Sequence, residues 1–495
     1  MSTVLQADYT YFEGRLQAGV VVHINSQGHI DRITRSESSV DSIQRNTSPS
    51  LPALSLETTN PGEFALPRAR RKHRLRGKVL LPGFINGHSH CFQRLMRGRA
   101  EHRPPGKAES SFWTWRDAMY KISETIDADE FEHVATFAFM EMLRAGFTHV
   151  AEFHYLHHQF GGHPYEDPAE LSRRLFRAAE YAGIGITVLP VAYSRGGHEQ
   201  VLTHAQRRFA HADIKAYTDL FDEAREHIDV EDRRTVNVGL AAHSVRALDR
   251  DFLSELAALK QDGNYLCHAH VSEQLREIEE CLAEHGRRPV ELLGELGFLD
   301  DRFTAVHATH LSAAEVNLLG EAKVTACICP TTERNLGDGL PQLREMIDAG
   351  VELAIGTDSQ VRIDPFAEVR ALEDGERLRV RERSVITNST GQVAPSILEV
   401  GTMGGARSVG LQQGQIAIGQ VANMISVDID TMALTGVSEG TESENSLLAG
   451  VMLTGHSSQV RDVWVGGRHI VIDGEVLRWE AARSNYLAVA RKLWS

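Results

Sequence analysis

Four short segments of this chain place histidine or aspartate at the end of an apolar run, where such residues could bind a metal ion. In the first, residues 79–81 predict a buried strand that leads through Pro82-Gly83 to His88-Ser89-His90. Side chains on an extended backbone repeat every second residue, so His88 and His90 project from the same face. Their Cα atoms are then roughly 6.5–7 Å apart, and two imidazoles can converge on one divalent ion. The other segments contain Cys267-His268-Ala269-His270, His307-Ala308-Thr309-His310 and Thr357-Asp358-Ser359.

Imidazole and carboxylate groups in this combination favour Zn²⁺, and they also allow Fe²⁺ or Mn²⁺. A catalytic ion keeps one coordination position for water and lowers the pKa of that water to roughly 7. Glu273 lies three residues after His270, so it could act in the same cavity as a general acid or base. His307 is a candidate to orient the water or to stabilise developing negative charge. His268 is an alternative ligand because it shares a strand face with His270, and we favour His270 because only it has Glu273 at this spacing.

The chain between and around these motifs alternates strand-like and helix-like patterns. Residues 128–145, for example, carry apolar side chains at helical spacing, and Gly146 is the expected stop. Eight apolar strands are predicted: the run into His88 and residues 148–153, 186–193, 236–244, 266–272, 304–310, 324–330 and 352–359. Eight strands with helical crossovers predict a (β/α)8 TIM barrel rather than an open doubly wound sheet. No Gly-x-Gly-x-x-Gly follows any of them, which argues against dinucleotide binding.

Polar residues collect at the C-terminal ends of the predicted strands. They are His88 and His90, His154 and Tyr155, His243 and Arg246, His270 and Glu273, His307, and Asp358. In TIM barrels this end carries the active site, whereas the opposite end contributes stability. Histidines that only satisfy hydrogen bonds in a core would not favour one end of every strand. The sequence therefore predicts one active site at the C-terminal end of the barrel.

The two ends of the chain show a different pattern. Residues 20–24 and 29–33 near the start, and 422–428 and 463–474 near the end, predict short strands joined by turns. Residues 34–65 are rich in Ser, Thr, Asn and Pro, which predicts a loose surface insertion. We therefore expect a small β-sandwich domain built from residues 1–78 and 416–495, and a catalytic barrel formed by residues 79–415.

Composition limits the possible partners. The chain has 495 residues and a net charge of −15, which argues against nucleic acid or an anionic membrane surface as the main partner. It does not exclude a small anionic substrate, because a pocket can carry local arginines. The five cysteines are few and odd in number, and no leader or membrane-length apolar run is evident. We expect reduced, buried thiols in a cytoplasmic protein.

The motifs together resemble those of the amidohydrolase superfamily. The resemblance rests on Pro82-Gly83 before His88-x-His90, then on His270, His307 and Asp358, and it covers nearly the whole chain. No lysine stands at the end of the fourth predicted strand, where binuclear members carry a carboxylated lysine. The resemblance therefore implies a mononuclear deaminase-type site. Its ligands would be His88, His90, His270 and Asp358, with Glu273 as the proton shuttle and His307 assisting the water.

Longer strings are similar to those of one deiminase branch of this superfamily. They include residues 88–94, 111–116, 151–158, 243–247 and 335–339. Carried over residue by residue, the resemblance implies that the substrate contacts are Gln93, Arg116, Tyr155, His243 and Arg246. It implies hydrolysis of N-formimidoyl-L-glutamate in histidine degradation, and guanidinium groups are well shaped to hold the two carboxylates of that substrate.

Two residues depart from the pattern of the branch. Cys91 stands where a small residue such as alanine is common, and Gln360 stands where a histidine is usual.

Two alternative functions remain open: deamination of a guanine-like heterocyclic amine, and a metal-free barrel used only for assembly. The intact set of candidate ligands argues against the second alternative. We expect the protein to form a homodimer.

Overall fold

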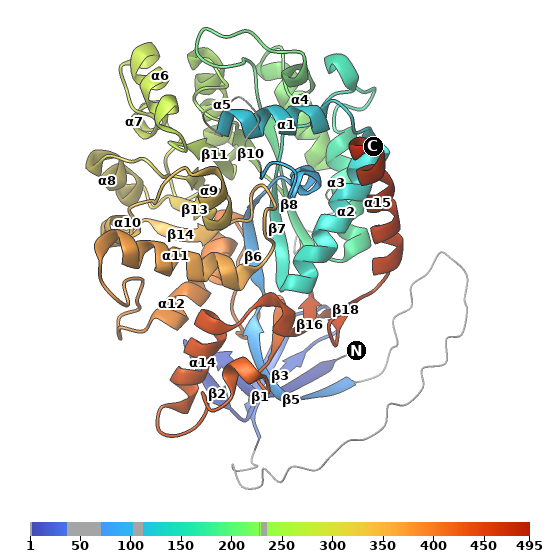
Figure 1. Cartoon of the computed structure of the whole chain (residues 1–495), viewed down its shortest axis with the longest axis vertical. Helices are drawn as coiled ribbons and strands as arrows, with labels where there is room; N and C mark the ends of the chain where they lie inside the picture. The colour runs from blue at the N-terminus through green and yellow to red at the C-terminus, as the bar shows by residue number, and fades with distance from the viewer. Residues whose placement is uncertain (1, 37–70, 102–111, 227, 229–234) are drawn as a thin grey trace.

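Two sheets and their surrounding helices make up the computed structural model, which describes residues 2–36, 71–101, 112–226, 228 and 235–495. One sheet and the helices around it form the upper part of Figure 1, and the second sheet lies below them. The strands of the second sheet come from both ends of the chain.

The upper sheet is a parallel barrel. Within the described residues it has nine strands in the order β6-β7-β8-β10-β11-β12-β13-β14, with β9 paired to β8. Their bounds are β6 Phe84–Ser89, β7 Phe147–His154, β8 Gly185–Ala192, β9 Val236–Val238, β10 Leu240–Ala242, β11 Cys267–Val271, β12 Phe303–His307, β13 Thr325–Ile328 and β14 Glu352–Ile355. Every residue of β7 and β8 is buried, as expected for strands covered on both faces. The predicted TIM barrel is confirmed.

The barrel closes where the first and last strands meet. Ser89, the last residue of β6, pairs in parallel with Asp358, which lies just beyond β14. The N–H groups of Thr357 and Asp358 each donate to the His88 carbonyl at 3.0 Å, and the His90 N–H donates to the Asp358 carbonyl at 3.0 Å. The closure therefore brings together candidate metal ligands that are far apart in the sequence.

Helices lie around the barrel and over its upper end, where Figure 1 shows α1. They are α1 Phe112–Ser123, α2 Ala128–Ala145, α3 Glu170–Ala182, α4 Ile214–Glu226, α5 Arg250–Gly263, α6 Leu275–His285, α7 Pro289–Glu295, α8 Ala313–Glu321, α9 Pro330–Leu336, α10 Leu343–Ala349, α11 Pro365–Val380, α12 Val393–Glu399 and α13 Gly405–Ser408. The bounds of α2 agree with the prediction. Asp127 forms a capping box at its start, and Gly146 ends it with a left-handed φ of 108°.

The second sheet also has nine strands within the described residues, in the order β18-β17-β16-β15-β5-β1-β3-β4 with β2 paired to β1. Their bounds are β1 Thr3–Phe12, β2 Arg15–Ala18, β3 Val20–Ile24, β4 Ile30–Arg35, β5 Arg71–Pro82, β15 Met424–Asp428, β16 Val460–Val465, β17 Arg468–Ile472 and β18 Glu475–Val476. Alternation along the strands divides their side chains between two cores: Leu80 and Trp464 pack in the core of this sheet, whereas Leu81 and Val463 belong to the larger core shared with the barrel. The predicted small β-sandwich from both chain ends is thus present, as one sheet enclosing its own core.

The last two helices connect this region to the barrel. Helix α14 spans Ser443–Thr454 and α15 spans Trp479–Trp494. Helix α15 packs on α2, where Phe137 stacks on Trp479 and Tyr486 with ring centroids 5.0 and 4.2 Å apart. The C-terminus accordingly lies beside the barrel helices in Figure 1.

Several predicted strand boundaries were wrong. The expected single strand into His88 is two strands, because β5 ends at Pro82 and pairs with β1 and β15, whereas the barrel strand β6 begins at Phe84. Residues 236–244 form two short strands separated at Gly239. Strand β12 ends at His307 rather than at residue 310, because His307 and Ala308 adopt positive φ angles of 70° and 50°.

Other predictions concern the insertion, the thiols and the membrane. Thr34 and Arg35, placed in the insertion, belong to β4, and residues 37–65 lie outside the described residues. All five cysteines are described, and all are buried and unpaired. Among the described helices, none is long and apolar enough to cross a membrane.

Candidate active site

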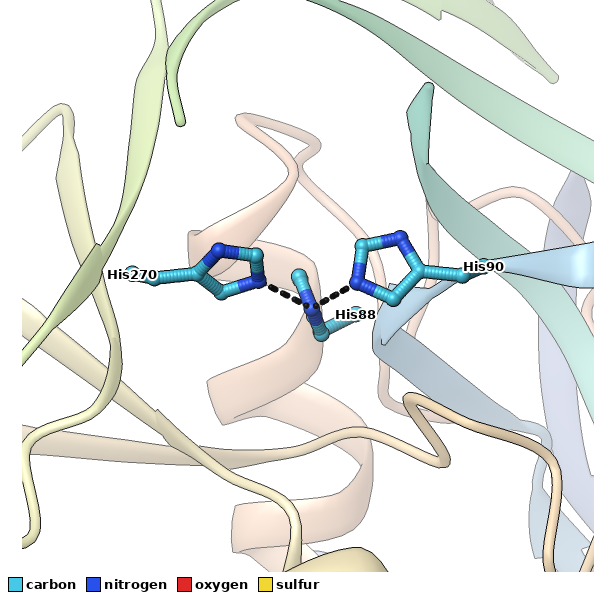
Figure 2. Close-up of side chains that lie close together, drawn as sticks. All are labelled: His88, His90 and His270. Carbon is cyan, nitrogen blue, oxygen red and sulfur yellow. Dashed lines mark hydrogen bonds between the residues drawn. The ribbon is translucent and has the colours of Figure 1, made fainter. Parts of the chain in front are cut away.

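Three histidines meet at the C-terminal end of the barrel, and Figure 2 shows their rings pointing toward one another. His88 lies on β6, His90 directly follows that strand, and His270 lies on β11. The Nε2 atom of His88 is 3.2 Å from Nε2 of His90 and 3.1 Å from Nε2 of His270. All three side chains are buried. The spacing of His88 and His90 therefore has the consequence expected of alternate residues on a strand.

Asp358 supplies an oxygen to the same point. Its Oδ1 atom lies 3.3 Å from Nε2 of His90 and 3.7 Å from Nε2 of His88. A tetrahedral zinc site with ligands about 2.0–2.1 Å from the ion has ligand atoms about 3.3–3.4 Å apart. His88, His90 and Asp358 thus have roughly the spacing expected around one such ion, and His270 Nε2 lies at a similar distance from His88 Nε2. Their nitrogen and oxygen donors suit Zn²⁺ or a neighbouring transition metal.

The protonation of the histidines also suits metal binding. His90 donates its Nδ1–H to the Phe153 carbonyl at 2.8 Å, so its Nε2 atom carries a free lone pair. Burial lowers the pKa of His90 to about 3, and burial also holds the pKa values of His88 and His270 well below the usual range. These imidazoles are therefore neutral at neutral pH, as metal ligands must be.

Buried carboxyl groups surround His307 on the other side of the site. Its Nδ1 lies 3.3 Å from Oε1 of Glu333, and its Nε2 lies 3.8 Å from both Oε1 of Glu273 and Oδ2 of Asp358. Burial alone would lower the pKa of His307, but Glu273, Glu333 and Asp358 together raise it well above its usual value. Burial raises the pKa of Asp358 to about 7, and it raises that of Asp338 to about 8 with Glu273 adding to the effect. Such a concentration of buried carboxyl groups favours a cation in their midst.

The backbone at the strand ends is held in unusual conformations. Positive φ angles occur at Ser272, His307, Ala308, Asp358 and Gln360, with values between 46° and 70°. Left-handed backbone is unfavourable for residues other than glycine, and it persists where the surrounding structure enforces it, often at functional sites. These turns direct His307 and Asp358 toward the histidines.

All five residues predicted as substrate contacts line one pocket together with His90, His270, Glu273, His307 and Asp358; they are Gln93, Arg116, Tyr155, His243 and Arg246. The pocket encloses about 560 Å³, including the space open to solvent at its mouth. Gln93 donates to the Tyr155 hydroxyl at 2.6 Å, and its own Oε1 atom is buried with no hydrogen-bond partner among the described residues.

The two arginines of the pocket influence each other. Burial lowers the pKa of Arg116, and the charge of Arg246 lowers it further. The loop that carries Arg246 is anchored by Arg195, which donates to the Val245 and Arg246 carbonyls at 3.1 Å and pairs with Glu284. Two neighbouring guanidinium groups in one pocket would be stabilised by an anionic ligand.

Several residues of the site were not predicted from the sequence. Glu333, the hydrogen-bond partner of His307, follows β13 in the first turn of α9, so the strand-end criterion could have found it. The pocket is also lined by Trp115, Met119, Tyr120, Tyr193, Phe209 and Leu336. Trp115 and Leu336 lie in strings similar to those of the deiminase branch, whereas the types of the other four side chains do not distinguish them from core residues.

Two histidines that sequence analysis considered lie away from the pocket. His268 lies two residues before His270 on β11, and its Nε2 donates to the Ser408 carbonyl at 2.6 Å. His154 is buried against Phe131 of α2, with ring centroids 5.4 Å apart. The geometry therefore favours His270 over His268 as the ligand from β11.

A TIM barrel with three imidazoles and a carboxylate converging at its C-terminal end defines a hydrolase of the metal-dependent type. The chain belongs to the amidohydrolase family, whose profile matches residues 79–470.

Individual relatives agree with this assignment. The chain is 38% identical to formimidoylglutamate deiminase of Pseudomonas aeruginosa over 84% of its length and 90% of the relative's. It is 28% identical to a 5-methylthioadenosine/S-adenosylhomocysteine deaminase of Natronomonas pharaonis over 82% of its length and 84% of that protein's. An amidohydrolase from Brucella melitensis matches the whole of both chains with a TM-score of 0.84 and 31% identity. An adenosine deaminase from Xanthomonas campestris, solved with bound zinc, shares the fold with a TM-score of 0.76 and 21% identity over 99% of this chain and 98% of that one.

The two histidines of β11 offer a direct test of the ligand set. His270→Ala should abolish stoichiometric zinc binding, because it removes the nitrogen nearest to His88 Nε2. His268→Ala is the matched control and should keep the ion, because His268 bonds to a backbone carbonyl instead. Elemental analysis after zinc loading and desalting measures both. Zinc retention by His270→Ala together with loss by His268→Ala would reverse the assignment.

Proposed function

We propose that this protein hydrolyses N-formimidoyl-L-glutamate to N-formyl-L-glutamate and ammonia, with one zinc ion held by His88, His90, His270 and Asp358. The observation that supports this substrate is the pair Arg116 and Arg246, which line the same pocket as His90, His270 and Asp358. The substrate has two carboxylates, and each guanidinium group can bind one of them through two parallel hydrogen bonds. The name of the Pseudomonas aeruginosa relative supports the same substrate.

When bound, the zinc ion would act as a Lewis acid and would lower the pKa of a water molecule to roughly 7. The reaction adds water across the formimidoyl C=N bond, and the bond from that carbon to the terminal nitrogen then breaks. The carbon becomes the formyl group, and the nitrogen leaves as ammonia. Asp358 Oδ2 lies 3.8 Å from His307 Nε2. In this arrangement Asp358 can take up the proton of the attacking water, and His307 can orient that water.

Glu273 acts as the proton shuttle in this proposal. It lines the pocket, and its Oε1 atom lies 3.8 Å from Nε2 of His307. A carboxyl group in this position can give a proton to the departing nitrogen, which would otherwise leave as a poor anionic group. Glu333 holds the far side of His307 through Nδ1 and so keeps its Nε2 directed toward the pocket.

The remaining pocket residues would orient the amidine. Gln93 offers a buried acceptor oxygen, and its amide nitrogen is held by Tyr155. His243 directly follows β10 and lies close to His270, with ring centroids 5.1 Å apart. Burial, reinforced by Arg246, holds the pKa of His243 well below its usual value, so the neutral ring can accept or donate one hydrogen bond.

Two further parts of the proposal concern the setting of the enzyme. The substrate places it in histidine degradation. We retain the expectation of a homodimer, and the burial of all five unpaired thiols supports the expectation of a reducing, cytoplasmic environment.

Ammonia release by the zinc-loaded protein tests the function. N-Formimidoyl-L-glutamate should be turned over far faster than N-formimidoyl-L-aspartate, guanine or 5-methylthioadenosine, because only the first combines a linear amidine with correctly spaced carboxylates. Preferential turnover of a heterocycle would replace the proposal with a ring deaminase. Absence of turnover of all four substrates by a protein with full zinc content would favour a non-catalytic role.

Glu273→Gln tests the proton shuttle. The variant keeps the shape of the side chain but cannot cycle a proton, so kcat should fall by about 10²–10⁴-fold with zinc content unchanged. Glu315→Gln is a control, because Glu315 is also buried but pairs with Arg288 outside the pocket. Steady-state kinetics and elemental analysis measure the two effects separately. Near-normal turnover by zinc-loaded Glu273→Gln would contradict the assigned role.

Arg116 and Arg246 test the identity of the substrate. Charge-assisted hydrogen bonds contribute about 1.5–3 kcal/mol each, so Arg→Met at either position should lower kcat/KM by roughly one to two decades. Arg→Lys should restore part of the loss, because lysine keeps the charge and loses the fork.

Substrates with one carboxylate capped as an amide refine this test. Wild type should discriminate against each capped substrate, and the Arg→Met variant at the matching position should discriminate much less. Equal discrimination by wild type and both variants would mean that neither arginine contacts a carboxylate.

A further inference from the structure

The metal site lies across the closure of the barrel, and the two sides of that closure are joined by buried side chains. His88 and His90 belong to the end of β6, whereas Asp358 follows β14. Any shift between these two chain segments would change the distance between Asp358 and the histidines. The hydrogen bonds that fix the segments therefore bear directly on the geometry of the candidate ligands.

One continuous chain of side-chain hydrogen bonds crosses this closure. Asn86 donates to the Thr357 hydroxyl at 2.7 Å, and that hydroxyl donates to Gln360 Oε1 at 2.9 Å. Gln360 then donates from Nε2 to the Ser89 hydroxyl at 2.9 Å, and Ser89 donates to Glu152 Oε2 at 2.6 Å.

The ends of the chain are also bonded to backbone. Asn86 Oδ1 accepts the Thr357 N–H at 2.9 Å, and Glu152 Oε1 accepts the Cys91 N–H at 2.6 Å. The second hydrogen of the Gln360 amide goes to the Asp358 carbonyl at 2.9 Å. Buried side chains thus hold Ser89, which lies between His88 and His90, Cys91, which directly follows His90, and Thr357, which directly precedes Asp358.

Asn86 and Thr357 already join β6 to the segment after β14, and Gln360 adds a second connection across this closure. Asn86 and Thr357, and likewise Ser89 and Glu152, form pairs on either side of Gln360, which joins the pairs through the two ends of its amide. The side chains of Gln360, Ser89 and Glu152 are no more than 1% exposed, so water cannot replace a lost bond without entering the barrel. An amide suits this place because it offers two donors and an acceptor at once.

We propose that Gln360 is a positioning residue for the metal site, which ties Ser89 and Asp358 together through the Asn86–Thr357–Gln360–Ser89–Glu152 hydrogen-bond chain. Its effect is on the alignment of His88, His90 and Asp358, and Gln360 itself contacts neither the ion nor the substrate. The inference rests on the proposed metal site and does not depend on which substrate the pocket accepts. It also gives a physical role to a residue that departs from the pattern of related deiminases.

Gln360→Met tests the proposal, because it keeps the length of the side chain and removes all of its hydrogen bonds. Gln459→Met is a matched control: Gln459 is a buried amide that makes three hydrogen bonds, to Asp428, Thr431 and His456, at the second sheet. Both variants should lower the melting temperature of the metal-free protein. Only Gln360→Met should also weaken zinc binding, by about 10–100-fold, as is typical for residues that orient metal ligands.

Competition with a chelator gives the zinc dissociation constant, and the absorption spectrum of the cobalt-substituted protein reports the ligand geometry. Gln360→Met should shift the cobalt spectrum and lower kcat with KM nearly unchanged. Gln459→Met should match wild type in zinc affinity, cobalt spectrum and kcat. Wild-type zinc affinity and cobalt spectrum in Gln360→Met would overturn the proposal and leave Gln360 with a purely structural role.

Ser89→Ala provides a second test if Gln360→Met does not fold. It breaks the next link of the same chain by removing one hydroxyl, and it should weaken zinc binding in the same direction. Wild-type zinc affinity in Ser89→Ala would overturn the proposal. Because zinc affinity is measured without substrate, a failed deiminase assay would leave these outcomes unaffected.

Discussion

The convergence of His88, His90 and His270 is the constraint on which the rest of this structure depends. Three buried imidazole nitrogens within 3.1–3.2 Å of their neighbour cannot all be satisfied by one another's protons, whereas a divalent cation can accept a lone pair from each. Buried carboxyl groups on the opposite side of the pocket add to the same demand for positive charge. The chemistry of the site follows from placing these groups together away from water.

The barrel makes this convergence possible because its strands all end at the same edge. The histidines leave β6 and β11 on the pocket side, and Asp358 reaches them across the closure of the barrel. Left-handed backbone at His307 and Asp358, with φ of 70° and 46°, turns the chain sharply at these ends. Hydrogen bonds such as those of Gln360 hold the strained segments in place. Arg116 lies on α1 and Arg246 on the loop after β10, so the predicted substrate contacts are on different segments from the candidate metal ligands.

The sequence predicted the features that depend on local periodicity. The alternation that places His88 beside His90, the helical spacing of residues 128–145 with Gly146 as their stop, and the polar ends of the barrel strands are all properties of short segments. The boundary between β5 and β6 at Pro82 could not be predicted, because an apolar run such as residues 79–81 is compatible with a strand of either sheet. Only the long-range pairing of β5 with β1 and β15 assigns it to the second sheet. The pairing role of Gln360 was missed for the same reason, since its partner Ser89 is distant in the sequence. Glu333, in contrast, closely follows a barrel strand and could have been predicted from that position. The residues predicted to contact substrate came from a family resemblance, and the structure places them in one pocket without testing their roles.

Anomalous diffraction at the zinc absorption edge, from a crystal of the zinc-loaded protein, tests the central claim most directly. The account predicts one strong peak per chain, within about 2.0–2.2 Å of one atom from each of His88, His90, His270 and Asp358. Two adjacent peaks, or a single peak bound by other residues, would contradict it.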